Sequence, residues 1–225
     1  MNLDQEKRLA GEAAADLVED GMTVGLGSGS TAVFMVRRLG ARVAEGLRMA
    51  GLPTSEGTAA LAREVGIPLS DFSRVTTLDL TLDGADEFDP ALHLTKGGGG
   101  ALFREKIVAA ASRRLVIFAD HTKRVARLGA FPLPVEVNPF GWQVVAAKIE
   151  ALGAAVARRE GSGEPFLSDN GAYILDCRFG EIPDPPALEE RLAGITGVTE
   201  TGLFIAMADE VLLADGEKLT RLKRG

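Results

Sequence analysis

Acidic residues, a lysine and a run of glycines gather in one stretch of the chain, and together they suit acid–base chemistry. Three acids fall within the five residues 83–87. A lysine, four consecutive glycines and a further glutamate follow in the sequence TKGGGGALFREKI. Adjacent glycines forfeit side-chain packing and lose more backbone entropy on folding than other residues do. We therefore expect a ligand to approach the backbone closely here, with the charged neighbours acting on it.

A second stretch, GLGSGSTA at residues 25–32, has the composition of an anion-binding loop. Small residues allow close approach, and N–H groups at a helix start favour negative charge. A Walker loop would need a lysine where Ser30 stands, and a dinucleotide fingerprint would need a third glycine at that same position. A site for one phosphate group fits best. A serine-capped helix after a tight turn remains the alternative.

Composition and charge narrow the class of protein. The 225 residues are 46% hydrophobic and 25% charged, as in an ordinary globular protein. A net charge of −7 argues against nucleic-acid binding. No apolar run approaches the roughly 20 residues of a membrane span, and the first residues lack the apolar region of a secretion signal. We expect a cytoplasmic protein, without a disulfide, whose single cysteine, Cys177, is buried.

The fold must position the two segments described above, and the pattern of the first two-thirds of the chain predicts which fold does so. Hydrophobic spacing alternates between helical and strand periods, which favours a parallel sheet covered by helices on both faces. Both segments follow predicted strands, so both can open on one crevice at the strands' carboxyl ends. The expected helices are 3–18, 31–40 (ended by Gly40), 55–66 and 101–112, and the expected strands are 22–27, 47–52, 77–84 and 113–120.

The order of the predicted strands and helices changes after the sequence FPLP. The order becomes β-α-β-β-α-β, which is the pattern of a ferredoxin-like unit of about 70 residues. We place this small domain at 131–205, and residues 1–130 plus 206–225 form the doubly wound domain. The expected strands are 133–138, 154–160, 172–179 and 198–205, the helices are 141–153 and 185–195, and a last strand at 209–216 returns to the first sheet.

The motifs VGLGSGSTA, DGADE, KGGGGALFREKI, FADHTKRV and FPLPVEV, in this order and spacing, resemble type A ribose-5-phosphate isomerase. The likeness runs from Lys7 to the last predicted strand. It implies interconversion of an aldose, ribose 5-phosphate, and a ketose, ribulose 5-phosphate, with no metal or organic cofactor. It also implies a doubly wound domain with a ferredoxin-like one, in homodimers or homotetramers.

The resemblance also implies roles for individual residues. Glu105 matches the base that moves the proton, and Lys96 with the backbone of Gly97–Gly99 matches the group that stabilises the developing oxyanion. Asp83 matches the residue that assists ring opening, and Asp86 one that holds sugar hydroxyls. The only departures noticed are Ser28 and Gly100, both small variants. The implied substrate-binding set is Lys7, Ser28, Gly29, Ser30, Thr31, Asp83, Gly84, Ala85, Asp86, Lys96, Gly97, Gly98, Gly99 and Lys123.

Other classes of function remain open at this point. A nucleotide-dependent oxidoreductase would use GLGSGS for a pyrophosphate and would bind nicotinamide stoichiometrically. A non-catalytic sugar-phosphate sensor would bind ligand without turnover. The chain has two histidines, His93 and His121, and these alone make no metal-binding set.

Overall fold

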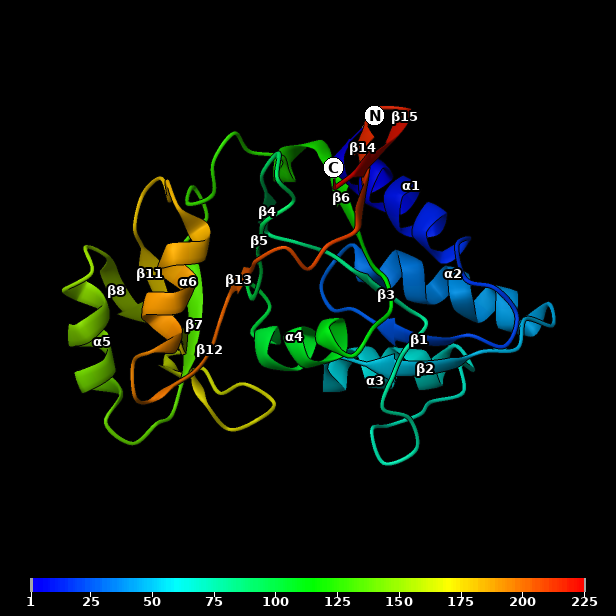
Figure 1. The fold of residues 1–225 in the computed structure, drawn as a ribbon. Helices are drawn as coiled ribbons and strands as arrows, with labels where there is room; N and C mark the ends of the chain where they lie inside the picture. Colours follow the sequence, from blue (N-terminus) through cyan, green and yellow to red (C-terminus); the bar gives the residue numbers. More distant parts are fainter. Residues whose placement is uncertain (1, 225) are drawn as a thin grey trace. The chain divides into compact units, whose positions relative to one another are not determined.

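The computed structural model describes residues 2–224, and the chain divides into two compact units (Figure 1). The first unit contains the residues up to Ala85, Arg104–Lys123 and the residues from Met207 onward. The second contains Asp86–Phe103 and Arg124–Ala206. The segment 86–103, which carries the glycine run, therefore belongs to the second unit, although it lies within the range predicted for the doubly wound domain.

The first unit is built on a six-stranded sheet in the order β15-β14-β6-β3-β1-β2. Every neighbouring pair is parallel except β14 and β15, which are antiparallel. The predicted α/β class with a mainly parallel sheet is confirmed. The strands are β1 (Thr23–Leu26), β2 (Ala50–Pro53), β3 (Leu80–Asp83), β6 (Leu115–Asp120), β14 (Glu210–Asp215) and β15 (Lys218–Lys223).

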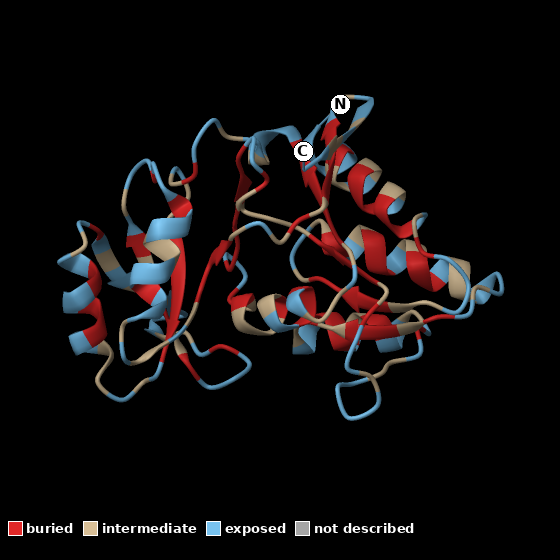
Figure 2. Cartoon of the chain, in the orientation of Figure 1, coloured by how far each residue is buried: buried red, intermediate tan, exposed pale blue. Residues whose placement is uncertain are grey.

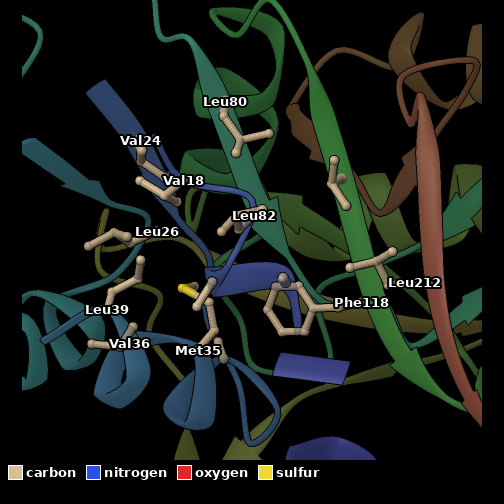
Figure 3. Packing of buried hydrophobic residues seen from close by; sticks show 14 of the residues in the cluster. Val18, Val24, Leu26, Met35, Val36, Leu39, Leu80, Leu82, Phe118 and Leu212 are labelled. Carbon is tan, nitrogen blue, oxygen red and sulfur yellow. The ribbon is translucent and has the colours of Figure 1, made fainter. Parts of the chain in front are cut away.

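Helices cover both faces of this sheet. Val24 and Leu26 point into the main hydrophobic core, where they pack with residues of α2 (Figure 3). Gly25, between them, faces the opposite side, where a Cβ would lie 2.5 Å from a methyl carbon of Val108 in α4. Side chains alternate across a strand, so the two contacts mark two covered faces. The helices of this unit are α1 (Leu3–Ala15), α2 (Ala32–Ala44), α3 (Glu56–Glu64) and α4 (Leu102–Ala110), the last of which begins in the second unit.

Helix α2 is longer than the sequence predicts. The expected end at Gly40 is wrong, because the helix continues to Ala44. Gly40 is buried within the helix, and a Cβ there would lie 2.6 Å from the side chain of Val65. The glycine is thus a packing position rather than a helix stop. Gly66, with a φ of +78°, does follow the end of α3 as expected.

The second unit contains a four-stranded antiparallel sheet in the order β12-β7-β11-β8. Its elements follow the predicted β-α-β-β-α-β order, with one added hairpin, and we propose that they form the ferredoxin-like unit expected from the sequence. The main elements are β7 (Leu133–Val137), α5 (Trp142–Glu150), β8 (Ala155–Arg158), β11 (Tyr173–Arg178), α6 (Pro185–Ala193) and β12 (Val198–Thr201), and the hairpin is β9 (Glu160–Gly161) with β10 (Glu164–Pro165).

A small three-stranded sheet, in the order β13-β5-β4, also belongs to the second unit. The prediction of one strand over 198–205 is wrong, because Gly202 divides it into β12 and β13. A Cβ on Gly202 would lie 2.4 Å from the carbonyl oxygen of Lys96, so the close approach of the two backbones requires glycine. The strands are β4 (Glu87–Phe88), β5 (Leu94–Thr95) and β13 (Leu203–Phe204).

The last strand, β15, pairs with β14 at the edge of the six-stranded sheet and was missed by the sequence prediction. Glu210 of β14 is buried and binds two guanidinium groups, those of Arg114 (2.9 Å) and Arg221 of β15. Burial alone would raise the pKa of Glu210, but these two contacts outweigh it and lower the pKa. Strand β14 itself is buried along almost its whole length (Figure 2).

The cysteine and the helix lengths bear on two further expectations. Cys177 is 1% exposed, which confirms the buried thiol, and burial followed by the charge of Asp176 raises its pKa to about 12. Among residues 2–224, no helix has the length and apolar character required to cross a membrane.

The packing around Gly40 predicts opposite effects for one substitution at two helical glycines. Gly40→Ala should lower the free energy of unfolding by about 1–3 kcal/mol, because Val65 must move. Gly57→Ala in α3, where only Ser55 Oγ lies within 4 Å of the added carbon, should raise it by up to about 1 kcal/mol through helix propensity. Urea unfolding of both variants measures this. Equal shifts for the two would contradict the packing role of Gly40.

Candidate active site

The loop after β1 is fixed in place by hydroxyl groups from the end of β2 and the start of α3. The hydroxyls of Thr54 and Thr58 donate to the carbonyl oxygens of Leu26 and Gly27, each at 3.1 Å. The hydroxyl of Ser28 donates to Ser55 Oγ at 2.7 Å. Both threonines are buried. The side chain of Ser28, which the resemblance placed on the substrate, is therefore engaged within the protein.

The rest of the loop keeps its donors available. The backbone N–H groups of Gly29, Ser30 and Thr31, and the hydroxyls of Ser30 and Thr31, have no hydrogen-bond partner among residues 2–224. Gly29 and Ser30 are exposed, and Gly29 has a φ of +105°, which favours glycine. The loop leads directly into α2, whose dipole favours an anion at this end. It therefore has the geometry of a phosphate site.

Helix α1 brings a cation toward this loop. Gly11 lets α1 pack against the start of α2, since a Cβ there would lie 3.0 Å from the carbonyl oxygen of Thr31. Lys7 lies one turn earlier on the same face of α1, because residues four apart are neighbours on a helix. Lys7 is half-buried and has no ion-pair partner among the described residues. Its ammonium can thus reach an anion held at the loop.

A buried glutamate links α1 to the short 3₁₀ helix η1 (His121–Lys123), which follows β6. Glu6 Oε2 lies 2.6 Å from His121 Nδ1, and Glu6 Oε1 accepts the N–H of Gly216 at 3.0 Å. The contact ties together two segments that each carry a lysine expected at the phosphate, Lys7 and Lys123. The sequence did not predict this contact between Glu6 and His121.

The same contact shifts two pKa values. The hydrogen bond with His121 lowers the pKa of Glu6 and raises that of His121, and the charges of Glu6, Asp215 and Asp120 raise the latter further. Asp215 lies close enough that ligand atoms of Glu6, His121 and Asp215 fall within 4.8 Å of one another. These three could hold a metal ion, although both oxygens of Glu6 already accept hydrogen bonds.

Asp83 occupies the end of β3 and is buried against the loop that follows β1. Its Oδ1 accepts the N–H groups of Gly84 (2.8 Å) and Ser28 (3.2 Å). A Cβ on Gly27 would lie 2.1 Å from that same oxygen, so the carboxylate takes the space that a side chain would fill. The strand order reverses between β1 and β3, which is where ligands bind in open α/β sheets.

Helix α4 carries Glu105 to this edge of the sheet. Val108 packs beside Gly25 of β1, and Ser112 beyond the helix forms a bridge with Leu78 just before β3. The helix therefore runs antiparallel to the strands, and its earlier residues lie toward their carboxyl ends. Glu105, three residues before Val108 on the same helical face, is 5% exposed. This places a buried carboxylate on the side where Asp83 lies.

The second unit groups the other predicted residues around the end of β5. Lys96 is 3% exposed, its Nζ lies 5.4 Å from the centroid of the Phe204 ring, and its N–H bonds to the carbonyl of Gly202 at 2.8 Å. Asp86 Oδ2 accepts the N–H of Gly98 at 2.7 Å. The N–H of Gly99 has no hydrogen-bond partner among the described residues. Of the predicted glycine amides, that of Gly98 is thus occupied and that of Gly99 is available.

Comparison with known proteins adds a separate line of evidence. Residues 50–218 match the family model described as ribose 5-phosphate isomerase A (phosphoriboisomerase A). The chain belongs to this family. Ribose-5-phosphate isomerase A 1 of Oceanobacillus iheyensis is 52% identical over 96% of this chain and 97% of its own, and ribose-5-phosphate isomerase A of Gloeobacter violaceus is 55% identical over 96% and 94%.

Solved structures of ribose-5-phosphate isomerases have the same fold. One, in complex with phospho-erythronic acid, is 36% identical with a TM-score of 0.97, and the match covers 100% of both chains. Ribose 5-phosphate isomerase A of Methanocaldococcus jannaschii is 38% identical with a TM-score of 0.93, over 97% of this chain and 98% of its own. The family is one of isomerases, which decides against the oxidoreductase and the sensor.

The Glu6–His121 contact predicts a pH dependence for the stability of this isomerase. The raised pKa of His121 stabilises the fold below its ordinary value of 6.5, and the contribution is lost as pH rises through the raised pKa. The lowered pKa of Glu6 stabilises above 4.5 and is lost as pH falls through the lowered pKa. His121→Asn should therefore lower Tm most between about pH 5 and 6.5 and least near pH 9.

Thermal unfolding across that pH range measures the effect. His93→Asn is the matched control, because His93 makes no ion pair in the part of the chain that the structure describes. Its effect on Tm should not change with pH in the same way. A His121→Asn difference that is constant from pH 5 to pH 9 would contradict an ionic Glu6–His121 pair.

Proposed function

We propose that this chain interconverts ribose 5-phosphate and ribulose 5-phosphate through an enediolate, with Glu105 as the base. The reaction, an aldose–ketose isomerisation of the pentose phosphate pathway, is the one for which its family is named. The observation that supports the mechanism is the arrangement at the β1/β3 edge. An anion-binding loop, the buried carboxylate of Asp83 and the buried carboxylate of Glu105 lie on the same side of one sheet.

The chemistry requires one proton to leave C2 and one to reach C1. Because these carbons are neighbours, one carboxylate can take the first proton and return it at the second position. Glu105 is proposed for this task. Asp83 is proposed to assist ring opening and to move the hydroxyl proton, since it sits at the strand end beside the loop. No step requires an oxidant or a metal ion.

Negative charge develops on the substrate oxygens in the enediolate, and the second unit offers suitable groups. Lys96 supplies an ammonium, and Gly99 an available amide. We propose that Lys96 and Gly99 stabilise this charge and that Asp86 holds sugar hydroxyls, as the resemblance implies.

The phosphate is proposed to lie at the loop 28–31, with Lys7 and Lys123 supplying full positive charges. The backbone N–H groups of Gly29, Ser30 and Thr31, and the hydroxyls of Ser30 and Thr31, complete this part, while the N–H and hydroxyl of Ser28 hold the loop in place. The remaining expectations stay proposals: a cytoplasmic protein that acts as a homodimer or homotetramer. Size-exclusion chromatography with light scattering would distinguish the two oligomers.

Replacing the proposed base tests the mechanism most directly. Glu105→Gln should lower kcat by at least about 10²-fold, as expected when a general base is removed. Exchange of the C2 hydrogen with deuterated solvent should be lost with it, while affinity for inorganic phosphate is kept. The assay follows ketose formation from ribose 5-phosphate in a buffer with a chelator, since no metal cofactor is expected.

Glu64→Gln, at the exposed end of α3, is the control and should behave as the wild type. Near-normal C2 exchange in Glu105→Gln would move the base elsewhere, and Asp83 would be the first residue to examine.

The role of the phosphate predicts how substitution of Lys123 divides between KM and kcat. A contact between a lysine and a phosphate is worth roughly 1.5–3 kcal/mol, so Lys123→Met should raise KM by about ten-fold or more. The reacting carbons are remote from the phosphate, and the loop still positions it, so kcat should stay within a few-fold. Steady-state kinetics separates the two constants.

Lys148→Met, in the exposed face of α5, is the control for removing one positive charge. Unphosphorylated ribose, which lacks every one of these contacts, should lose kcat as well as affinity. An unchanged KM in Lys123→Met would remove this lysine from the site.

A further inference from the structure

Within the second unit, the glycine turn is held from one side by an arginine that the sequence did not single out. Arg159 follows β8, and its Nη1 donates to the carbonyl oxygens of Gly97 (2.8 Å) and Gly98 (3.1 Å). The opposite edge of the turn is held by Asp86, which accepts the N–H of Gly98 at 2.7 Å. The turn is closed by a bond from the N–H of Gly100 to the carbonyl of Gly97.

These contacts fix the direction of the Gly99 amide, whose N–H has no hydrogen-bond partner among the described residues. A peptide group is planar and trans, so the carbonyl of one residue and the N–H of the next point in opposite directions. Arg159 holds the carbonyl of Gly98, and the N–H of Gly99 therefore points away from Arg159. The same rule accounts for Gly98, whose N–H points to Asp86 while the carbonyl of Gly97 points to Arg159.

Arg159 is itself held on several sides. Its Nε and Nη2 bond to the two carboxylate oxygens of Asp176 in β11, a paired geometry that fixes the plane of the guanidinium group. Its backbone donates to the carbonyl of Ile174 and accepts from the N–H of Phe166. The side chain is 14% exposed, and the guanidinium carbon lies 5.8 Å from the centre of the Phe166 ring.

Two positions of the glycine turn leave no room for a side chain. A Cβ on Gly100 would lie 2.5 Å from the Phe166 ring, and one on Gly98 would lie 2.5 Å from Asp86. Gly97 and Gly100 both have positive φ values, +102° and +79°. The glycines thus permit the backbone conformation, but they do not by themselves choose among the many that glycine allows. An external contact has to make that choice.

We propose that Arg159, oriented by Asp176, is the positioning residue that sets the Gly97–Gly100 turn for oxyanion stabilisation. Arg159 acts through the turn rather than on the substrate. The proposal rests on the proposed function, in which the Gly99 amide faces the enediolate. A donor that is misplaced by about 1 Å can cost up to about 10²-fold in rate, so holding the turn has a measurable consequence.

A purely structural ion pair would have a different signature. Removing such a pair would lower stability and would affect ground-state and transition-state binding alike. Removing the clamp should instead lower kcat, because the oxyanion forms only after substrate is bound. The two possibilities therefore differ in the division of the effect between kcat and KM.

Arg159→Met tests the proposal, and Arg158→Met is the matched control. Arg158 precedes it in the chain and is also largely buried, but its guanidinium stacks on Trp142 and Tyr173 instead. Arg159→Met should lower kcat by about 10- to 100-fold with KM within a few-fold, whereas Arg158→Met should leave kcat within about two-fold. Asp176→Asn, which keeps Arg159 but removes its charged partner, should fall between these.

Two ligands separate the loss of the clamp from loss of the fold. Phospho-erythronic acid carries a carboxylate that resembles the charged enediolate, and inorganic phosphate carries only the group proposed for the loop 28–31. Arg159→Met should weaken binding of the first by about ten-fold and leave the second unchanged, as expected for an interaction made with the developing charge. Calorimetry measures both, and equal losses for the two ligands would overturn the proposal in favour of a structural role.

Chemical rescue gives an independent readout. Arg159 and Asp176 line an open cavity of about 580 Å³ with Gly98, so a small cation can enter from solvent. Guanidinium at about 20 mM, far below the molar concentrations that unfold proteins, should restore part of kcat in Arg159→Ala and none in Glu105→Gln. An unchanged kcat in Arg159→Met, or a lowered kcat in Arg159→Ala that guanidinium does not restore, would overturn the clamp alone. Wild-type protein that binds both ligands without turnover would instead overturn the proposed function, and the clamp's catalytic role with it.

Discussion

The buried carboxylate of Asp83 is the interaction on which the proposed site of the first unit depends. It lies at the end of β3 and accepts an N–H from the loop after β1, so it joins two parallel strands where the strand order reverses. It can do so only because Gly27 has no side chain. The loop is thereby held beside an acid, and its remaining amides have no hydrogen-bond partner among residues 2–224. One contact thus holds the proposed anion-binding loop beside the acid proposed for proton transfer.

The net charge of −7 does not prevent the proposed anion binding, because binding depends on the groups at the site itself. Backbone amides at the start of α2 carry partial charge without adding net charge, and they need no reorganisation when a ligand arrives. The full charges, Lys7 and Lys123, come from segments that the Glu6–His121 pair ties together. Exposed acids elsewhere interfere little with the proposed phosphate site, since exposed charges are screened over about 8–10 Å at ordinary ionic strength.

The sequence predicted the features that are local in the chain. Strand–helix alternation, the glycine turn and the loop 25–32 each show in a short window, because period and turn chemistry are local properties. The contacts that hold the site are not local. Arg159 meets a carbonyl 62 positions away, and Glu6 meets His121 across 115 positions. An isolated arginine or glutamate gives no sign of such a partner.

Errors in the predicted elements have the same origin. Gly40 was taken as a helix end because glycine often terminates helices, but Val65 packs on it from another segment. Gly202 divides a run that has strand composition throughout, because Lys96 approaches it from the small sheet. Strand β15 has exposed and partly buried residues in alternation, and its charged composition hid the pattern. In each case tertiary contact outweighed local preference.

The cationic strand β15 also protects one edge of the six-stranded sheet from open-ended strand pairing with other molecules. A parallel sheet that ended at β14 would present unpaired N–H and C=O groups along an apolar strand, which is a template for polymerisation. β15 covers that template with a rim of lysine and arginine, and the Arg221–Glu210 contact fastens it. One tight turn at Gly216 joins β15 to β14, and the ladder between the two strands holds it there. Loss of β15 would expose the edge of β14 to pairing with strands of other molecules, while the residues proposed for chemistry remained in place.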